Sequence, residues 1–221
     1  MAKEPKFASG AERFIETTLA LIAEEGGSQN VNLRQVSRRL GCAHTNLYNY
    51  FASYEDLLWA AFRRAICIYG DFLVRGLDDN LAPGEYLRRV VSNLAAFPVE
   101  QPGLFRFVGS DPINPDRIPD DILDAVGAMK TWLFEVMRTV YGGDADPEDA
   151  ASVSNIVLAY IDGETLNLIN GRMVRGEDIH SRIVANSIRL VEALTGAAPA
   201  ATGSPSHPYP AMDLSALKKG A

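Results

Sequence analysis

The chain has 221 residues, 47% hydrophobic and 22% charged, so it is long enough to bury the core of one or two domains. No apolar run approaches the roughly 18 residues of a membrane-spanning helix, and residues 1–10 lack the apolar stretch of a signal peptide. We therefore expect a cytoplasmic globular protein. Its two cysteines, Cys42 and Cys67, have no metal-ligand spacing, and we predict no disulfide, no metal and no cofactor.

The charge is unevenly distributed along the chain. A net charge of -7 argues against a nucleic-acid partner when taken alone, because a phosphate-binding surface usually has a basic excess. Residues 1–65, however, contain eight Lys or Arg against seven Asp or Glu, whereas residues 66–221 contain thirteen against twenty-one. A near-neutral head on an acidic body fits a DNA-binding module joined to a domain that does not contact DNA.

Helical periodicity and cap residues recur along the chain and strand signals are nearly absent, so we predict an all-α fold of about nine helices. Asn32 and Ser53 are the expected N-caps of the second and fourth helices. The expected helices are 10–25, 33–40, 44–50, 54–77, one from Pro83 that ends at the Pro98–Pro102 segment, 104–108, one from Pro119 to Gly142, 147–171 and 178–195.

These helices predict three regions. Residues 1–53 form a three-helix head with a helix-turn-helix, and the long fourth helix joins it to a helical effector-binding and dimerisation domain, residues 54–196. Residues 197–221 contain four prolines and many small residues, which indicates a flexible tail.

Residues 33–51, LRQVSRRLGCAHTNLYNYF, have the layout of a helix-turn-helix. Ser37 is the small residue that two steeply crossing helices need, and Gly41 suits a turn residue with positive φ. The residues expected to pack against the first helix are Val36, Leu40, Cys42, Leu47 and Tyr50. The exposed side chains of the second helix are then short or planar hydrogen-bonding groups, which suit base edges in a major groove.

The stretch from Phe14 to Leu58 resembles the DNA-binding domain of the tetracycline-repressor (TetR) family. Leu47-Tyr-Asn-Tyr-Phe51 matches the family's Leu-Tyr-x-aromatic-Phe pattern, and residues 53–58 are similar to the start of its fourth helix. The resemblance implies a homodimeric one-component transcriptional regulator, most commonly a repressor, that binds an inverted-repeat operator in double-stranded DNA. It also implies release from DNA by a small, largely apolar effector.

Three positions depart from the family pattern. Tyr54 stands where a basic residue is usual, Ala43 replaces a hydroxyl cap, and Thr45-Asn46 replaces a Gly-Thr pair. We expect these changes to alter contacts and sequence preference rather than to abolish DNA binding. The candidate DNA-contacting residues are Arg34, Ala43, His44, Thr45, Asn46, Tyr48, Asn49 and Tyr54.

The body is rich in aromatic residues and methionine, most of which must be core. The resemblance implies an effector cavity among the fourth to eighth helices and a dimer built from the eighth and ninth. The candidate effector contacts are Trp59, Phe62, Ile66, Tyr69, Phe97, Phe105, Met129, Trp132 and Tyr160. The candidate dimer contacts are Val153, Val157, Ile161, Ile183, Ile188 and Val191. Arg106, between Phe105 and Phe107, is expected to reach solvent.

Of two other functional classes, one stays an alternative and one is disfavoured. The acidic balance and Tyr54 are compatible with a helical protein-interaction or ligand-sensing module that does not bind an operator. An enzyme is disfavoured, because His44, His180 and His207 do not assemble with a nucleophile, and Asp162 and Glu164 point to different faces of a helix.

Overall fold

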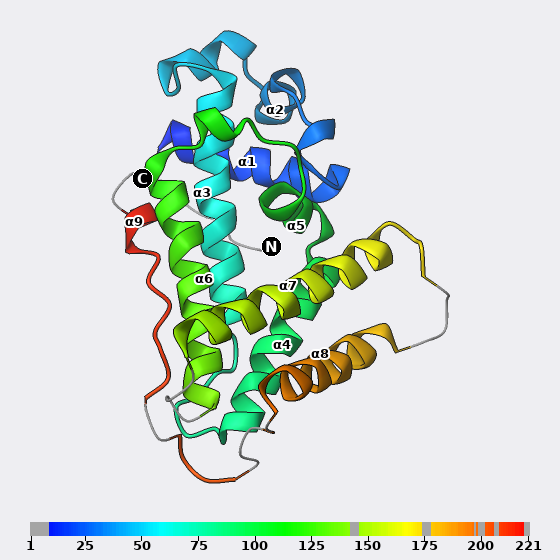
Figure 1. The fold of residues 1–221 in the computed structure, drawn as a ribbon. Helices are drawn as coiled ribbons and strands as arrows, with labels where there is room; N and C mark the ends of the chain where they lie inside the picture. The colour runs from blue at the N-terminus through cyan, green and yellow to red at the C-terminus, as the bar shows by residue number, and fades with distance from the viewer. Residues whose placement is uncertain are drawn as a thin grey trace, which may run out of the picture. The chain divides into compact units, whose positions relative to one another are not determined.

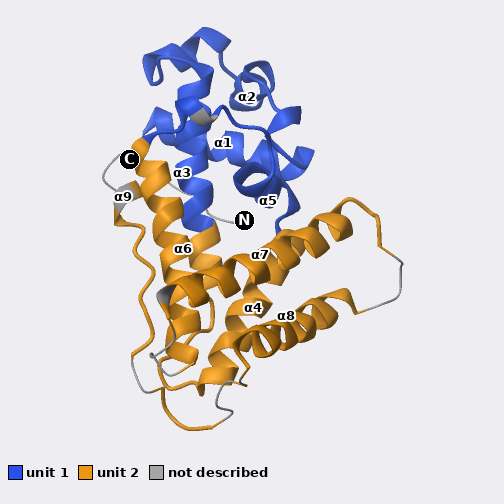
Figure 2. Ribbon diagram, in the orientation of Figure 1, with its two compact units in different colours: residues 1–68, 101–119, 221 blue, residues 69–100, 120–220 orange. Residues whose placement is uncertain are grey.

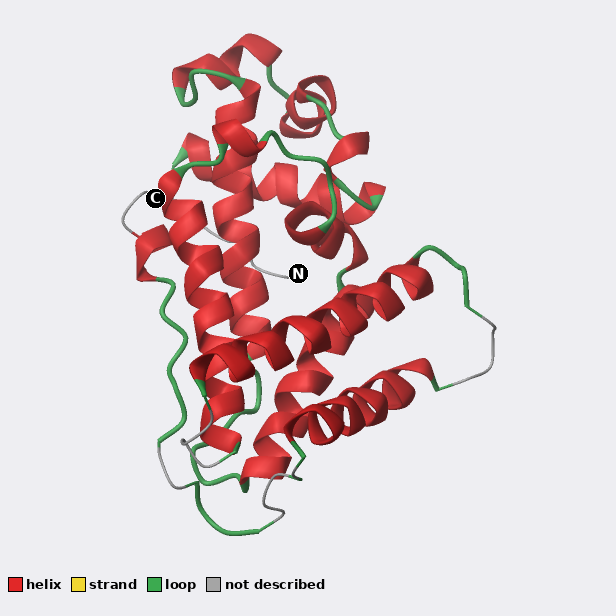
Figure 3. Ribbon diagram, in the orientation of Figure 1, coloured by secondary structure: helices red, strands yellow, loops and turns green. Residues whose placement is uncertain are grey.

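The computed structural model describes residues 9–141, 146–173, 178–196, 198, 202–205 and 208–218. All regular elements in these ranges are helical (Figure 3), which confirms the all-α prediction. The α-helices are α1 (Gly10–Glu25), α2 (Leu33–Leu40), α3 (Tyr54–Leu73), α4 (Pro83–Glu100), α5 (Pro102–Gly109), α6 (Asp120–Val140), α7 (Pro147–Ile169), α8 (Ile179–Thr195) and α9 (Ser215–Lys218). The 3-10 helices are η1 (Ser28–Asn30), η2 (His44–Asn49) and η3 (Pro115–Arg117). Among the described residues, no helix is both long and apolar enough to span a bilayer.

The helix boundaries follow the sequence signals with four differences. At the C-terminus, residues 215–218 form the short helix α9, where the sequence predicted only a flexible tail. The third predicted helix is the 3-10 helix η2, and α3 ends at Leu73 rather than at residue 77. Helix α4 continues through Pro98 to Glu100, although a proline was expected to end it. Pro98 is buried in the last turn of α4, where its missing N–H removes one intrahelical hydrogen bond.

The chain divides into two compact units (Figure 2). Unit 1 comprises residues 1–68 and 101–119 together with residue 221, and unit 2 comprises residues 69–100 and 120–220. Helix α3 contributes to both. The segment with α5 and η3 lies in the chain between two helices of unit 2, yet it belongs to unit 1.

Unit 1 is built around α1. Helix α1 packs against α2 on one part of its surface and against α5 on another. Its apolar face is buried, as expected for residues at helical spacing. The fully or nearly fully buried side chains of the unit include Phe14, Ile22, Val36, Leu47, Leu57, Phe62 and Ile66.

Unit 2 is a bundle in which α4 contacts α6, α7 and α8. Helices α7 and α8 also lie side by side (Figure 1). One continuous apolar cluster fills the space between the four helices, and its members include Leu87, Val90, Leu133, Val136, Val157, Ile161, Ile183 and Val191. The short α9 packs on α6.

Candidate nucleic-acid interface

Helix α2 and the turn after it are fixed by local hydrogen bonds. The Asn32 side chain accepts hydrogen bonds from the N–H groups of Arg34 (3.1 Å) and Gln35 (3.2 Å), and the Gln35 side chain accepts one from the Asn32 N–H (2.8 Å). This reciprocal capping box confirms Asn32 as the N-cap. Gly41 has a φ of 67°, which confirms the predicted left-handed turn residue, and the Cys42 N–H donates to the Ser37 carbonyl (3.0 Å).

The segment η2 follows this turn as a 3-10 helix. Ala43 offers no side-chain cap, and the main chain closes on itself through the Asn46 N–H to the Ala43 carbonyl (2.9 Å). Leu47 is fully buried and anchors the segment in the core of unit 1. The six-residue segment is therefore held by one apolar side chain, while most of its other side chains face outward.

The outward side chains of η2 are the ones predicted from the sequence. Tyr48 is 57% exposed, and Asn49 donates a hydrogen bond from Nδ2 to Oδ1 of the half-buried Asn46 (2.7 Å). This bond orients both amides and leaves them a free donor and a free acceptor, the pair that reads the edge of adenine. The remaining exposed residues of the segment are Ala43, His44 and Thr45.

Tyr50, expected to pack against the first helix, does so on one side only. Its ring centroid lies 5.9 Å from that of Phe14, and Gly10 leaves the space that the ring occupies, since a Cβ there would lie 2.3 Å from the phenol oxygen. The side chain is nevertheless 46% exposed. Tyr48 and Tyr50 are thus two exposed aromatic groups on one short segment.

The arginines of α2 differ in their partners. Arg39 forms a two-point ion pair with Glu24 (3.0 and 2.6 Å), and this hydrogen bonding lowers the pKa of the Glu24 carboxyl. Arg34 and Arg38 are exposed and form no ion pair with any described residue. Arg34 and Arg38 are therefore the cations of α2 that are free to meet a phosphate.

Tyr54, the residue in place of the family's basic position, is occupied by an internal contact. Its hydroxyl donates a hydrogen bond to the Val31 carbonyl (3.1 Å), and partial burial raises the pKa of the phenol to about 12. The phenol keeps its proton at neutral pH and donates it in the hydrogen bond to the Val31 carbonyl. Tyr54 thereby ties the start of α3 to Val31, the residue that follows η1.

The segment after α4 is joined tightly to the end of α1. At Gly103 a Cβ would lie 2.4 Å from the Ile22 carbonyl oxygen, so only glycine allows this approach of α5 to α1. Arg106 Nη1 donates to the Gly26 carbonyl (3.1 Å), and Asp111 accepts a hydrogen bond from the Ser28 N–H (2.7 Å). The expectation that Arg106 reaches solvent is therefore wrong, because the carbonyls at the end of α1 need donors.

The nine candidate effector residues are divided between the two units. Trp59, Phe62, Ile66 and Phe105 belong to unit 1, and the other five belong to unit 2. Phe62 packs on Trp59 and Phe107, with centroid distances of 5.7 and 5.2 Å, and Tyr69 packs on Phe97 at 4.6 Å. These contacts place most of the aromatic residues in the packed interior of their own unit.

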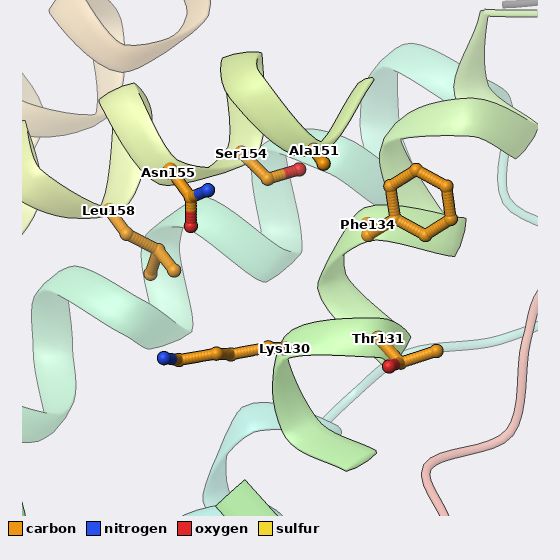
Figure 4. A pocket seen from close by; sticks show the side chains of 7 residues that line it. All are labelled: Lys130, Thr131, Phe134, Ala151, Ser154, Asn155 and Leu158. Carbon is orange, nitrogen blue, oxygen red and sulfur yellow. The ribbon is translucent and has the colours of Figure 1, made fainter. Parts of the chain in front are cut away.

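Unit 2 has a cavity of about 320 Å³ between α6 and α7 (Figure 4). We call it the Lys130 cavity. Its lining is Lys130, Thr131 and Phe134 from α6 and Ala151, Ser154, Asn155 and Leu158 from α7, and none of these was singled out from the sequence. Lys130 forms no ion pair with any described residue. The one sequence signal for the cavity was an isolated lysine in the acidic body. This signal is weak, because the sequence does not show that α7 lies opposite the lysine.

The six candidate dimer residues all lie in the interior of unit 2. Four of them are at most 1% exposed: Val157, Ile161, Ile183 and Val191. The other two, Val153 and Ile188, are 7% exposed. They pack α7 and α8 onto the rest of the bundle. The large apolar side chains that α7 and α8 do expose are Ile156 and Leu194, at 42% and 43%.

Solved structures provide the comparison, since no family model and no curated protein matches this sequence. A TetR-like transcriptional regulator from Rhodococcus sp. RHA1 aligns with a TM-score of 0.63 over 84% of this chain and 96% of its own, at 12% identity. A protein of unknown function from the same organism aligns with a TM-score of 0.70 over 86% of this chain and 98% of its own, at 17% identity. The third structure is a single-substitution variant of TetR from Acinetobacter baumannii AYE, solved in complex with minocycline. It aligns with a TM-score of 0.58 over 86% of this chain and 98% of its own, at 14% identity.

This chain has the TetR fold. The match extends over most of the chain and is not confined to the helix-turn-helix motif. In this TetR-like protein, the motif comprises α2, the Gly41 turn and η2, as the sequence predicts. No group of three or more His, Cys, Asp or Glu side chains in the described parts of the TetR-like chain is arranged to hold a metal ion.

Proposed function

We propose that this protein is a homodimeric transcriptional regulator that binds operator DNA through η2 and the start of α2. The observation that carries the proposal is the outer surface of η2. A fully buried Leu47 fixes the segment, and its exposed side chains, Tyr48 and the hydrogen-bonded Asn46–Asn49 pair, are suited to base edges. The unpaired Arg34 at the start of α2 would contact a phosphate and set the register.

The dimer gives the operator its symmetry. A two-fold dimer presents two η2 segments to successive major grooves, about 34–36 Å apart or a multiple of that, so the operator is an inverted repeat. We assign the interface to the exposed faces of α7 and α8, with Ile156 and Leu194 as its apolar contacts. The buried residues Val157 and Ile188 support these faces from inside.

The decisive experiment is selection of bound sequences from random DNA, followed by affinity measurements on the selected site and a scrambled one. We expect an inverted repeat and a preference for it. Tyr48→Ala and Asn49→Ala should each weaken specific binding by about 1–3 kcal/mol if the lost contact reads a base. Val99→Ala, an exposed residue of unit 2, is the matched control and should leave affinity unchanged.

Equal affinity for selected and scrambled DNA would instead favour a helical interaction or ligand-sensing module without an operator. Two observations support that second candidate. The protein has a net charge of -7, and the hydroxyl of Tyr54, at the usual phosphate-contacting position, is already bonded to Val31.

We further propose that a small molecule bound in unit 2 weakens operator binding and so relieves repression. The Lys130 cavity is the site we favour, because its volume lies at the low end of small-molecule pockets. Phe134 and Leu158 provide apolar surface, and Lys130 with Asn155 provides a cation and an amide. Its chemistry selects an effector with a compact apolar body and one carboxylate, which refines the largely apolar effector expected from the sequence.

The route from effector to DNA would run through the segment that returns to unit 1. Residues 101–119 connect α4 to α6, both in unit 2, and are bonded to α1 through Arg106 and Asp111. An effector shifts the equilibrium only if it prefers the low-affinity conformation, and a coupling of about 1–3 kcal/mol would lower operator affinity roughly 5- to 150-fold.

The effector proposal is tested with a panel of aromatic carboxylates and their neutral amides, first by calorimetry on the free protein and then on the operator complex. We expect carboxylates to bind more tightly than amides, and Lys130→Gln to remove the difference. Arg189→Gln, which removes an exposed cation of α8, is the control. Carboxylate binding that Lys130→Gln leaves intact would place the effector site elsewhere.

A further inference from the structure

The C-terminal residues 208–218 lie against unit 2 rather than apart from it. The ring of Tyr209 stacks on that of Tyr86, with centroids 3.6 Å apart and planes at 13°, and its hydroxyl donates a hydrogen bond to the Leu81 carbonyl (2.9 Å). Tyr209 is 8% exposed and Tyr86 is 3% exposed. The phenol of Tyr209 is therefore held by an aromatic face and by one acceptor.

Three further contacts hold the same segment. Trp132 of α6 donates from Nε1 to the Pro210 carbonyl (3.0 Å). At Gly70 of α3 a Cβ would lie 2.5 Å from Leu214 Cδ1 and 3.2 Å from Met212 Sδ, so the absence of a side chain there makes room for the segment. Leu217 of α9 is 3% exposed, and α9 packs on α6 (Figure 1).

The sequence before this segment differs in character. Residues 197–207 contain only Ala, Pro, Thr, Gly, Ser and His, so they supply no large apolar side chain for a core. Residues 208–218 are thus attached to α8 by a stretch of linker composition. A group held in this way competes with free ligands at an effective concentration in the range of about millimolar.

We propose that the Tyr86 ring and the Leu81 carbonyl form a binding site for a phenol, that Tyr209 occupies it as a tethered ligand, and that free phenolic compounds displace residues 208–218. The site is separate from the Lys130 cavity, with which it shares no residue. It favours a ligand with an uncharged aromatic ring and a hydroxyl donor, whereas the Lys130 cavity favours an anion. The proposal does not depend on DNA binding.

The test uses 4-methylphenol, which is the tyrosine side chain itself, with the full chain and with its Tyr209→Ala variant. Calorimetry should show at least tenfold tighter binding to Tyr209→Ala, because the tethered competitor has been removed. Toluene, which has the ring but cannot donate to the Leu81 carbonyl, should bind the variant more weakly than 4-methylphenol. Equal affinity of 4-methylphenol for both chains, or no binding to a folded Tyr209→Ala chain, would overturn the proposal.

Displacement is distinguished from the filling of an engineered hole by following the indole N–H resonance of Trp132 in the unaltered chain. Saturating 4-methylphenol should move this resonance to its position in a chain that ends at Gly196, since both states lack the bond to Pro210. A resonance that stays in place while 4-methylphenol binds would show that the segment is a fixed part of the fold. Gly70→Val in the full chain provides the displaced reference if the shortened chain does not fold.

Discussion

The α-carbon of Gly103 lies against the main chain of Ile22, so close that a Cβ would come within 2.4 Å of the Ile22 carbonyl oxygen. This contact brings α5 onto α1 within unit 1, and it accounts for the assignment of residues 101–119 to the unit that carries the helix-turn-helix. Because the contacted atoms belong to a backbone, no side-chain rotation can relieve a clash there.

Gly103→Ala should destabilise the protein by about 1–3 kcal/mol, the usual cost of forcing an extra carbon into a packed contact. Urea unfolding followed by circular dichroism measures the change in the free energy of unfolding. Gly109→Ala, at the end of the same helix, is the matched control, because a Cβ there would lie 3.7 Å from Phe105, an ordinary contact. Equal stability of the two variants would refute the tight docking of α5 on α1.

Arg34→Gln should reduce the salt dependence of operator binding. Each lost phosphate contact lowers the slope of log affinity against log salt by about one, so a symmetric dimer should lose about two. Arg39→Gln should change the slope less, because the Arg39 guanidinium is already paired with Glu24. Affinities measured between about 50 and 200 mM salt give both slopes. The reverse ranking would exclude Arg34 as a phosphate contact.

Tyr54→Phe should lower the free energy of unfolding by about 0.5–1.5 kcal/mol, because the Val31 carbonyl loses its hydrogen-bond donor. Operator affinity at matched folded fractions should stay unchanged, since the hydroxyl is engaged inside the protein. Tyr48→Phe, which alters an exposed side chain, should leave stability unchanged. If Tyr54→Phe instead weakens operator binding without affecting stability, the phenol contacts DNA.

The same phenol predicts a pH dependence. Burial raises the pKa of Tyr54 from about 10 to about 12, so between these values the unfolded chain loses a proton that the folded chain keeps. The contribution to stability is complete below pH 10 and is lost as the pH rises toward 12. Tyr54→Phe should flatten the loss of stability over this window in urea titrations. An unchanged slope would mean that Tyr54 titrates normally.

Ile156→Asp should weaken dimerisation, because it places an unpaired carboxylate on the exposed face that we assign to the interface. Sedimentation should show more monomer, and operator affinity should fall with it although no DNA contact is altered. Leu123→Asp, at a similarly exposed apolar position of α6, is the control and should remain dimeric. Helical content must be unchanged in both. A dimer that tolerates Ile156→Asp would place the interface elsewhere.

The sequence by itself determined the features that depend on neighbours along the chain. The caps Asn32 and Ser53, the left-handed Gly41 and the helical class are local, because each rests on hydrogen bonds or periodicity within a few residues. The outward-facing residues of η2 were predictable for the same reason, since the burial of Leu47 leaves its neighbours exposed.

Only the tertiary structure decided which face of each helix is covered and by what. Helices α7 and α8 carry more apolar residues than one interface needs, and it is the packing on α4 and α6 that buries Val157 and Ile183 and leaves Ile156 exposed. The docking of α5 on α1, the Lys130 cavity and the position of Tyr209 each join residues far apart in the chain. Such pairings are decided by the shape and hydrogen-bonding needs of the partner surface, and no local pattern encodes that partner.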